Sequence, residues 1–312
     1  MKLKYLLRIL VVLVIVIVSA VYIQHSLSLI KEQVVNKKST KLLNDLKIEE
    51  TYAEDIGFVV LAGISENKQI IQALKKNDRN IAILELNSII SEYKQKTNIQ
   101  NLKIHIHTAD VKSFIRSWKL DKYGDDLSGF RETINEVKAT EKPIFAFEIG
   151  RIGLTLRSLL PIIDNGKYLG SIEFIQQFDQ APEKFEKQGN QYLLLMNKSY
   201  LNIAKYLKDA PEIANYKVSS KFFNKNFIEE ARKIDMNKML KNHYLLTDKY
   251  LFVYKIIKDV KGKELGLHLL AMPSEEVHKM IVHDKKEALI LYSMFIVGIL
   301  FVFIVIYFAI KK

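Results

Sequence analysis

Cysteine is absent from the 312-residue chain, and proline and glycine are scarce, with 5 and 12 copies. The lack of cysteine excludes disulfides, thiolate metal sites and cysteine nucleophiles. The sequence also lacks a Gly-x-Ser-x-Gly elbow, a His-Glu-x-x-His zinc motif and a glycine-rich phosphate loop. No arginine-rich stretch or aromatic-basic motif indicates nucleic-acid binding. We therefore expect no enzyme, no nucleic-acid partner, no cofactor and no metal site.

Charge is almost absent from two long apolar runs, at residues 6–23 and 288–310. The first run carries only Arg8, near its start, and the second carries no charge. At about 1.5 Å per helical residue the second run spans roughly 34 Å, which is enough to cross a hydrocarbon core of about 30 Å. The sequence therefore predicts two transmembrane helices with a large domain between them.

Basic residues flank both runs at the ends of the chain, namely Lys2, Lys4, Arg8, Lys311 and Lys312. Under the positive-inside rule, residues 1–5 and 311–312 lie in the cytoplasm. We therefore expect a two-pass protein of the inner (plasma) membrane whose main domain lies in the periplasm or outside the cell.

A cleaved signal peptide is an alternative for the first run. Val18-Ser19-Ala20 places small residues where signal peptidase could cut, behind a basic start. The apolar run is longer than a usual signal core of about 7–15 residues, which favours an uncleaved anchor.

The segment between the runs is mildly basic. Five of the 47 basic residues lie in the flanks, and the remaining 42 stand against 35 acidic residues, which leaves a net charge of +7. This balance indicates attraction of anionic small molecules or of a membrane surface.

Apolar residues recur at helical spacing after the first run, at Leu27, Ile30, Val34, Val35, Leu42, Leu43, Leu46 and Ile48. The pattern predicts one long helix that continues out of the membrane, then shorter helices at 67–75 and 80–94, within a helical lead-in over 24–98. The apolar stripe exceeds what one domain needs, so we expect a homodimer.

Two modules of strands and helices follow, at residues 99–181 and 182–286. In the first we expect strands at 102–108, 144–149, 154–163 and 168–178, a loop at 117–129 and a helix at 127–140. In the second we expect strands at 191–196, 250–259 and 265–272, and helices at 200–208, 226–235 and 274–286. Asp164-Asn165-Gly166 is a strong hairpin signal between two of these strands.

A short motif repeats between the modules. Residues 166–172 read GKYLGSI and residues 262–268 read GKELGLH, so Gly-Lys-x-Leu-Gly recurs after 96 residues in the same hairpin context. The repeat indicates two related modules, each an antiparallel sheet with helices packed on it.

Two stretches, IHIHTADVKSFIRSWKLDKYGDDLSGF at 104–130 and FEIGRIGLTLRSLLPIIDNGKYLGSIEFIQ at 147–176, carry a family resemblance. Over about residues 25–285 the chain resembles the double Cache sensor domain of bacterial chemoreceptors, histidine kinases and diguanylate cyclases. The resemblance implies an α+β fold: a long N-terminal helix and two tandem PAS-like modules with antiparallel sheets, flanked by two transmembrane helices. It also implies a small ligand in the membrane-distal module, here 99–181, and 182–286 as the membrane-proximal module.

Members of that family continue past the second span into a HAMP linker and an output domain, whereas this sequence stops at Lys312. We expect a truncated receptor, a receptor that signals through a cytoplasmic or membrane partner, or a fragment of a longer chain.

His105 and His107 alternate on one predicted strand and therefore face the same side. The functional interpretation is ligand contact, and the alternative is a strand that faces water. A metal ion would need a third ligand, and no residue nearby in the sequence has metal-site spacing.

Arg116, Trp118, Tyr123 and Asp125 lie close together in and around the predicted loop. A guanidinium grips a carboxylate with two hydrogen bonds, rings enclose a small ligand, and an aspartate can bind an amino group. The alternative is that Trp118 is a core plug and that Arg116 pairs with an aspartate.

Glu148, Arg151, Arg157 and Glu173 place charges in or beside apolar strands. They are either site residues or members of a solvated face. Glu173 aligns with Leu269 across the internal repeat, which favours the first module as the ligand-binding one.

The function we predict is a membrane-anchored sensor of an organic acid or amino-acid-like ligand, which signals across the membrane. Arg116 would bind the acid group while Trp118 and Tyr123 enclose the ligand. The alternative is a membrane-anchored interaction protein that contacts another sensor or an envelope component and has no ligand of its own.

Overall fold

The computed structural model describes residues 2–97, 99 and 101–311. Met1, Asn98, Gln100 and Lys312, which belong to the predicted termini and the predicted module boundary, lie outside the described residues. The chain divides into two compact units. One unit runs to Leu42 and adds Tyr244–Phe252 and the chain from Ala271 onward, and the other comprises Leu43–His243 and Val253–Leu270.

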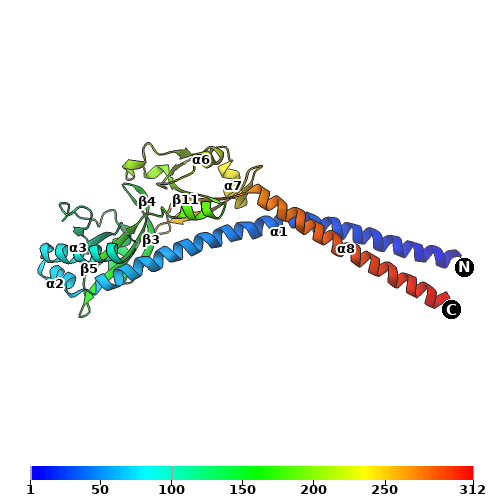
Figure 1. Ribbon diagram of the computed structural model, residues 1–312, viewed down its shortest axis with the longest axis horizontal. Helices are drawn as coiled ribbons and strands as arrows, with labels where there is room; N and C mark the ends of the chain where they lie inside the picture. The colour runs from blue at the N-terminus through cyan, green and yellow to red at the C-terminus, as the bar shows by residue number, and fades with distance from the viewer. Residues whose placement is uncertain (1, 98, 100, 312) are drawn as a thin grey trace. The chain divides into compact units, whose positions relative to one another are not determined.

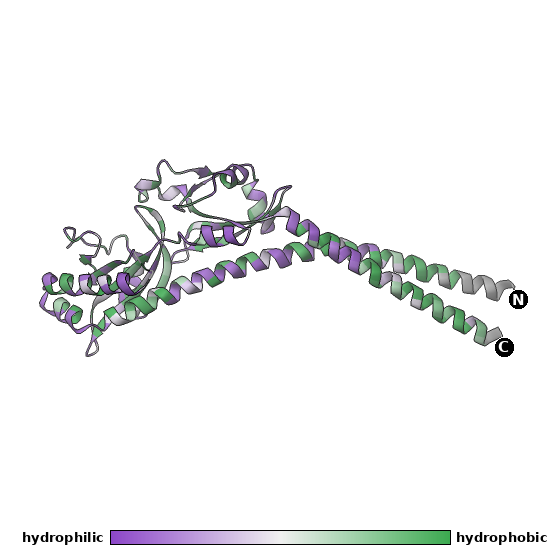
Figure 2. Cartoon of the chain, viewed as in Figure 1, coloured by the Kyte–Doolittle hydropathy of each residue, from purple (hydrophilic) through white to green (hydrophobic). Residues whose placement is uncertain are grey.

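Two long helices supply most of the first unit (Figure 1). α1 spans Lys2–Ser65 and α8 spans Ser274–Lys311, and both are long and apolar enough to cross a membrane. Figure 2 shows apolar residues gathered on both helices toward the chain termini. The predicted helix at 274–286 and the predicted span at 288–310 form one continuous helix, because no proline interrupts them.

A five-stranded antiparallel sheet lies in the second unit, with strand order β2-β1-β5-β4-β3. The strands are β1 (Lys103–Thr108), β2 (Ser113–Arg116), β3 (Ile144–Gly150), β4 (Gly153–Asp164) and β5 (Lys167–Gln176). All four predicted strands of the first module are confirmed, and the short β2 was not predicted. Asn165 and Gly166 both have positive φ, at 47° and 76°, as the hairpin signal requires.

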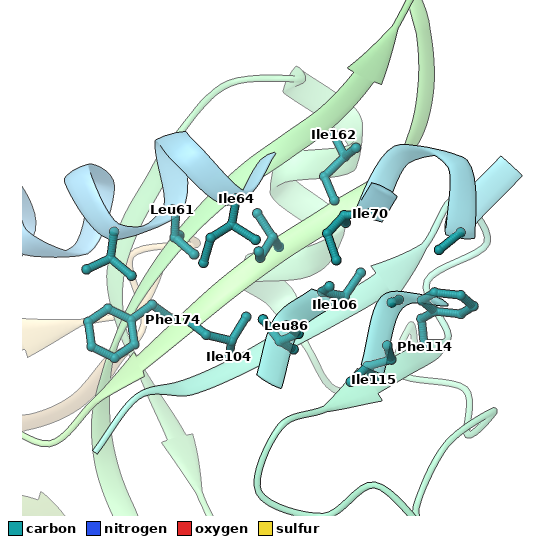
Figure 3. Packing of buried hydrophobic residues seen from close by; sticks show 14 of the residues in the cluster. Leu61, Ile64, Ile70, Leu86, Ile104, Ile106, Phe114, Ile115, Ile162 and Phe174 are labelled. Atoms are coloured by element: carbon teal, nitrogen blue, oxygen red, sulfur yellow. The ribbon is translucent and has the colours of Figure 1, made fainter. Parts of the chain in front are cut away.

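The hydrophobic core of this module lies on one face of the sheet. α2 (Lys68–Lys76), α3 (Arg79–Lys96) and the end of α1 cover that face. Figure 3 shows the packed residues, which include Leu61, Ile64, Ile70, Leu86, Ile104, Ile106, Phe114, Ile115, Ile162 and Phe174. Because side chains alternate along a strand, Ile104 and Ile106 point into this core and His105 and His107 point to the opposite face.

A short helix, α4 (Glu132–Thr140), packs on the opposite face through Ile134 and Val137, which contact Leu159 of β4. It begins five residues later than predicted. Asp126 accepts hydrogen bonds from the backbone and side chain of Ser128, which holds the preceding residues in turns.

The second sheet has strand order β7-β8-β6-β11-β10-β9. Its strands are β6 (Gln191–Asn197), β7 (Glu212–Ile213), β8 (Tyr216–Val218), β9 (Tyr244–Leu246), β10 (Tyr250–Lys258) and β11 (Glu264–Pro273). Its helices are α5 (Ala181–Lys187), α6 (Lys225–Arg232) and α7 (Met236–Asn242). The three predicted strands are confirmed. The predicted helix at 226–235 is confirmed as α6, which ends three residues early, at Arg232, and α7, which begins after its N-cap Asp235, was not predicted.

The predicted helix at 200–208 is wrong. This segment contains only 3₁₀ turns, at Lys198–Tyr200 and Lys205–Leu207. Its backbone is hydrogen-bonded to other parts of the fold: Tyr206 N–H donates to Arg151 O, and Lys217 Nζ donates to Lys208 O. These tertiary bonds replace the bonds within a helix that the local pattern predicted.

The repeated Gly-Lys-x-Leu-Gly motif marks the same close strand contact in both sheets. A Cβ on Gly170 in β5 would collide with the carbonyl oxygen of His107 in β1. A Cβ on Gly266 in β11 would collide in the same way with the carbonyl oxygen of Leu195 in β6. The internal repeat therefore has a structural cause, since both sheets need a residue without a side chain at this point.

We expect Gly266→Ala to lower the free energy of unfolding by about 1–3 kcal/mol, because an added methyl group must push apart two paired strands. The measurement is the apparent melting temperature of the full chain in nanodiscs. Gly129→Ala is the matched control, since a methyl group added at Gly129 would meet only open space. Equal melting temperatures for the two variants would contradict the assignment.

Candidate functional site

Polar side chains occupy the face of the first sheet that lies opposite the hydrophobic core, and we call this set the polar face. Its members are His105, His107, Ser113, Arg116, Arg131, Thr133, Glu148, Arg157, Ser171 and Glu173. None of them is more than 8% exposed. Burying so many polar and charged groups is costly unless they pair with one another, so the polar face needs a dense network.

Glu173 lies at the centre of this network and is fully buried. Its Oε1 accepts a hydrogen bond from Arg131 Nη2 and another, at 3.1 Å, from Arg157 Nη1. Its Oε2 lies 3.3 Å from His105 Nδ1 and 3.7 Å from His107 Nε2. None of these last three atoms has a hydrogen-bond partner among the described residues.

Arg131 connects Glu173 to a second buried carboxylate, Glu148. Arg131 Nε donates to Glu148 Oε2 at 2.6 Å. Glu148 Oε1 accepts from the backbone N–H of Thr133 at 3.2 Å and from its hydroxyl at 3.1 Å. With Arg157, the two arginines and two glutamates balance in charge, which makes their joint burial tolerable.

Serines hold the two imidazole rings in place. His105 Nε2 and Ser113 Oγ are 2.9 Å apart, as are His107 Nδ1 and Ser171 Oγ. The ring centroids lie 4.1 Å apart. Each histidine thus has one nitrogen engaged by a serine and the other directed at Glu173.

Burial sets the charge of these groups. It lowers the pKa of His105 to about 4 and the pKa of His107 well below its usual value. Burial alone would raise the pKa of Glu173, but the guanidinium groups of Arg131 and Arg157 hold that pKa well below its usual range. At neutral pH the polar face therefore contains neutral imidazoles and an ionised carboxylate.

We expect the protein to lose stability as the pH falls through the range between 6.5, the ordinary pKa of histidine, and about 4, the pKa of folded His105. In this range the unfolded chain binds a proton that the folded chain excludes, which costs about 1.4 kcal/mol per pH unit and per group. The lowered pKa of Glu173 adds a loss only below 4.5, its ordinary value. The measurement is the melting temperature as a function of pH in chelator-containing buffer. We expect His105→Gln to reduce the slope of melting temperature against pH. A melting temperature that does not change with pH in the unsubstituted protein would contradict the prediction.

The loop after β2 is held by an ion pair. Arg116 binds Asp125 with both arms of its guanidinium, at 2.7 Å each, and donates to Lys122 O at 2.8 Å. The pairing of Arg116 with an aspartate, the alternative considered from the sequence, is therefore present.

The loop's aromatic residues are on the surface. Trp118 is 44% exposed, which rules out the alternative that it is a core plug. Its ring meets that of His105 edge-on, with centroids 5.7 Å apart. Tyr123 is 55% exposed, and Arg79 Cζ lies 3.4 Å from the centre of its ring. Both rings are therefore accessible to a ligand beside the polar face.

A cleft of about 1070 Å³ borders the polar face at Ser113 and is lined by Tyr123 and Gly124 of the loop. Its charged lining residues are Lys75, Arg79, Lys112, Lys167, Asp110 and Asp164. Two of the lysines pair with the aspartates, Lys75 with Asp164 and Lys112 with Asp110. The excess of basic groups gives the cleft a positive potential that favours anionic ligands.

Sequence reasoning located most of the polar face but not all of it. Arg151 is exposed at the turn between β3 and β4, outside the network. Arg131, Ser113, Ser171 and Thr133 were missed. Ser171 was detectable, because it lies two residues before Glu173 on the same strand and so shares its face.

The second module contains a smaller buried polar group. Tyr192 Oη lies 2.7 Å from His268 Nδ1, and His268 Nε2 lies 3.3 Å from Glu50 Oε1. The aromatic rings of Phe147 and Phe178 surround His268.

Solved sensor domains resemble this chain in structure. The sensory domain of the Campylobacter jejuni chemoreceptor Tlp3 with isoleucine bound is 12% identical, with 80% of this chain and 97% of that chain covered and a TM-score of 0.45. The sensor domain of the Vibrio cholerae histidine kinase DctB is 12% identical, with 80% and 98% covered and a TM-score of 0.43. No curated protein sequence matches the chain.

A family model described as the double sensory domain of two-component sensor kinases, dCache_3, matches residues 60–277. The match includes both sheets, the polar face and the cleft. Because it spans more than half of the sequence, the chain belongs to the double Cache family of sensory domains, whose members are ligand-binding modules without catalytic activity.

Proposed function

We propose that this protein is a membrane-anchored, extracytoplasmic sensor whose first module binds a small anionic or zwitterionic organic molecule. The observation that carries the proposal is the basic cleft of about 1070 Å³ next to a buried, charged sheet face. Membership of the double Cache family and two helices suited to crossing a membrane support the same function. The Tlp3 domain was solved with an amino acid bound, which is consistent with a ligand of this class.

The ligand would bind by replacing one partner of an existing ion pair. Asp125 holds the guanidinium of Arg116 with two hydrogen bonds, and the side chain of Asp125 is 34% exposed. A ligand carboxylate has the same shape and charge as the Asp125 carboxylate and can replace it as the partner of the Arg116 guanidinium. The released Asp125 carboxylate is then free to bind an amino group of the same ligand, while Trp118 and Tyr123 cover it.

Signal transmission would begin where α1 contacts the sheet. Gln176 Nε2 of β5 donates to Ala53 O of α1 at 2.9 Å, and Gly57 brings the helix close to Ser158 of β4. A change in sheet curvature on ligand binding would therefore displace the helix that leads to the first span. The ligand must bind one of the two conformations more tightly for a signal to follow.

Intrinsic fluorescence provides the test, because Trp118 is the only tryptophan in the chain. The full chain in nanodiscs is titrated with amino acids, organic acids, amines and purines. We expect a saturable change in Trp118 emission, with a matching rise in melting temperature, for a carboxylate-containing compound. If well-folded protein responds to none of these classes, the interaction-protein alternative is favoured.

A further inference from the structure

Three buried polar atoms on the polar face converge on one point, and none of them has a hydrogen-bond partner in the described part of the chain. They are His105 Nδ1, His107 Nε2 and Glu173 Oε2. Each of the three residues offers one atom that could bind a metal ion, and these atoms lie within 4.8 Å of one another. Each residue is at most 1% exposed. Most buried polar atoms in proteins are hydrogen-bonded, so three unpaired ones at one place require an explanation.

The surroundings of these atoms match those of metal ligands. In metal sites a ligating histidine engages its second ring nitrogen with a polar partner, which fixes the orientation of the ring. Ser113 and Ser171 have that position here, each 2.9 Å from the second nitrogen of His105 or His107. Arg131 and Arg157 bind Oε1 of Glu173, which leaves Oε2 directed at the two rings.

The two distances from Glu173 to the histidines are close to those between the ligands of a small divalent ion. Ligands about 2.0–2.2 Å from a tetrahedral zinc ion lie roughly 3.3–3.6 Å from one another. Glu173 Oε2 lies 3.3 Å from His105 Nδ1 and 3.7 Å from His107 Nε2. We propose that His105, His107 and Glu173 bind one divalent transition-metal ion, with Zn²⁺ as the representative.

Two imidazoles and one carboxylate form a ligand set suited to Zn²⁺, Co²⁺ or Ni²⁺, and not to the oxygen-only coordination of Ca²⁺ or Mg²⁺. Three protein ligands leave a coordination position for water or an anion. Because two guanidinium groups already lie beside Glu173, we expect weaker binding than at a site without neighbouring cations. The site does not depend on the organic ligand proposed above.

Cobalt is a suitable probe, because tetrahedral Co²⁺ absorbs strongly in the visible range. The chelator-treated full chain in nanodiscs, without organic ligand, is titrated with Co²⁺ and separately with Zn²⁺. A second group of potential ligands, His283, Asp284 and Glu287, lies on α8, with His283 and Glu287 exposed, so all titrations use a His283→Ala background. We expect one Co²⁺ per chain with a visible spectrum, quenching of Trp118 emission, and displacement by Zn²⁺.

Variants assign the signal to the three residues. His107→Gln is expected to weaken Co²⁺ binding by more than about 100-fold, and Ser113→Ala by about 10-fold or more, since it removes only the orienting partner of His105. Ser113→Ala leaves all three ligands in place, so it serves if His107→Gln does not fold. A chain that binds no Co²⁺, or a folded His107→Gln variant that binds it normally, would overturn the proposal. Either result leaves the Trp118 response to organic ligands unaffected.

Discussion

Replacing Arg131 by methionine is expected to lower the free energy of unfolding by about 3–5 kcal/mol, the usual cost of breaking a buried ion pair by removing one partner. Arg131 bonds both Glu148 and Glu173. Without Arg131, Glu148 keeps the two hydrogen bonds from Thr133. The guanidinium group of Arg157 then lies 3.9 Å from the Glu148 carboxylate, too far for a hydrogen bond. The measurement is the melting temperature of the full chain in nanodiscs at neutral pH.

Arg151→Met is the matched control for this experiment, because Arg151 is exposed and lies outside the polar face. Surface substitutions of this kind usually change stability by less than about 0.5 kcal/mol. If the two variants melt together, Arg131 does not hold the buried carboxylates in the way the structure indicates.

Arg116→Ala is expected to weaken the binding of a carboxylate ligand by about 30-fold or more, as removal of one partner from a desolvated charge pair costs at least about 2 kcal/mol. The readout is the concentration of ligand at which the Trp118 emission is half changed. Asp125 keeps partial access to solvent, so the variant should remain folded.

Lys119→Ala is the control, since Lys119 is an exposed cation of the same loop. A general loss of positive charge would weaken binding equally in both variants, whereas a specific role for the guanidinium predicts a loss in Arg116→Ala only. Normal affinity in Arg116→Ala would remove Arg116 from the site.

The elements that were predicted correctly are those marked by a local pattern in the sequence. The charge-free run at 288–310 lies within α8, and the alternating residues at 102–108 form β1. The Asp-Asn-Gly turn lies between β4 and β5, as its chemistry requires. At residues 200–208 the predicted helix does not form, because the backbone N–H of Tyr206 bonds to Arg151 O and the carbonyl of Lys208 accepts from Lys217 Nζ.

The centre of the polar face was less accessible from the sequence. His105 and Glu173 are paired residues of β1 and β5, so their contact depends on the register of two strands that are distant in the chain. Spacing in the sequence therefore does not indicate that Glu173 lies beside the two histidines. Arg131 was missed because it precedes α4 in a stretch without periodicity, and only the fold turns it toward Glu148.

The glycine contacts have an evolutionary consequence. Gly170 and Gly266 keep the same backbone spacing in two sheets, and the residue three positions later is Glu173 in one and Leu269 in the other. In both sheets the backbone constraint is thus carried by a glycine, which has no side chain to contact a ligand. Mutations can then change the residues facing a ligand without disturbing strand pairing. Two sheets with the same backbone spacing can in this way differ in their buried side chains, with a carboxylate at this position in one and an apolar residue in the other.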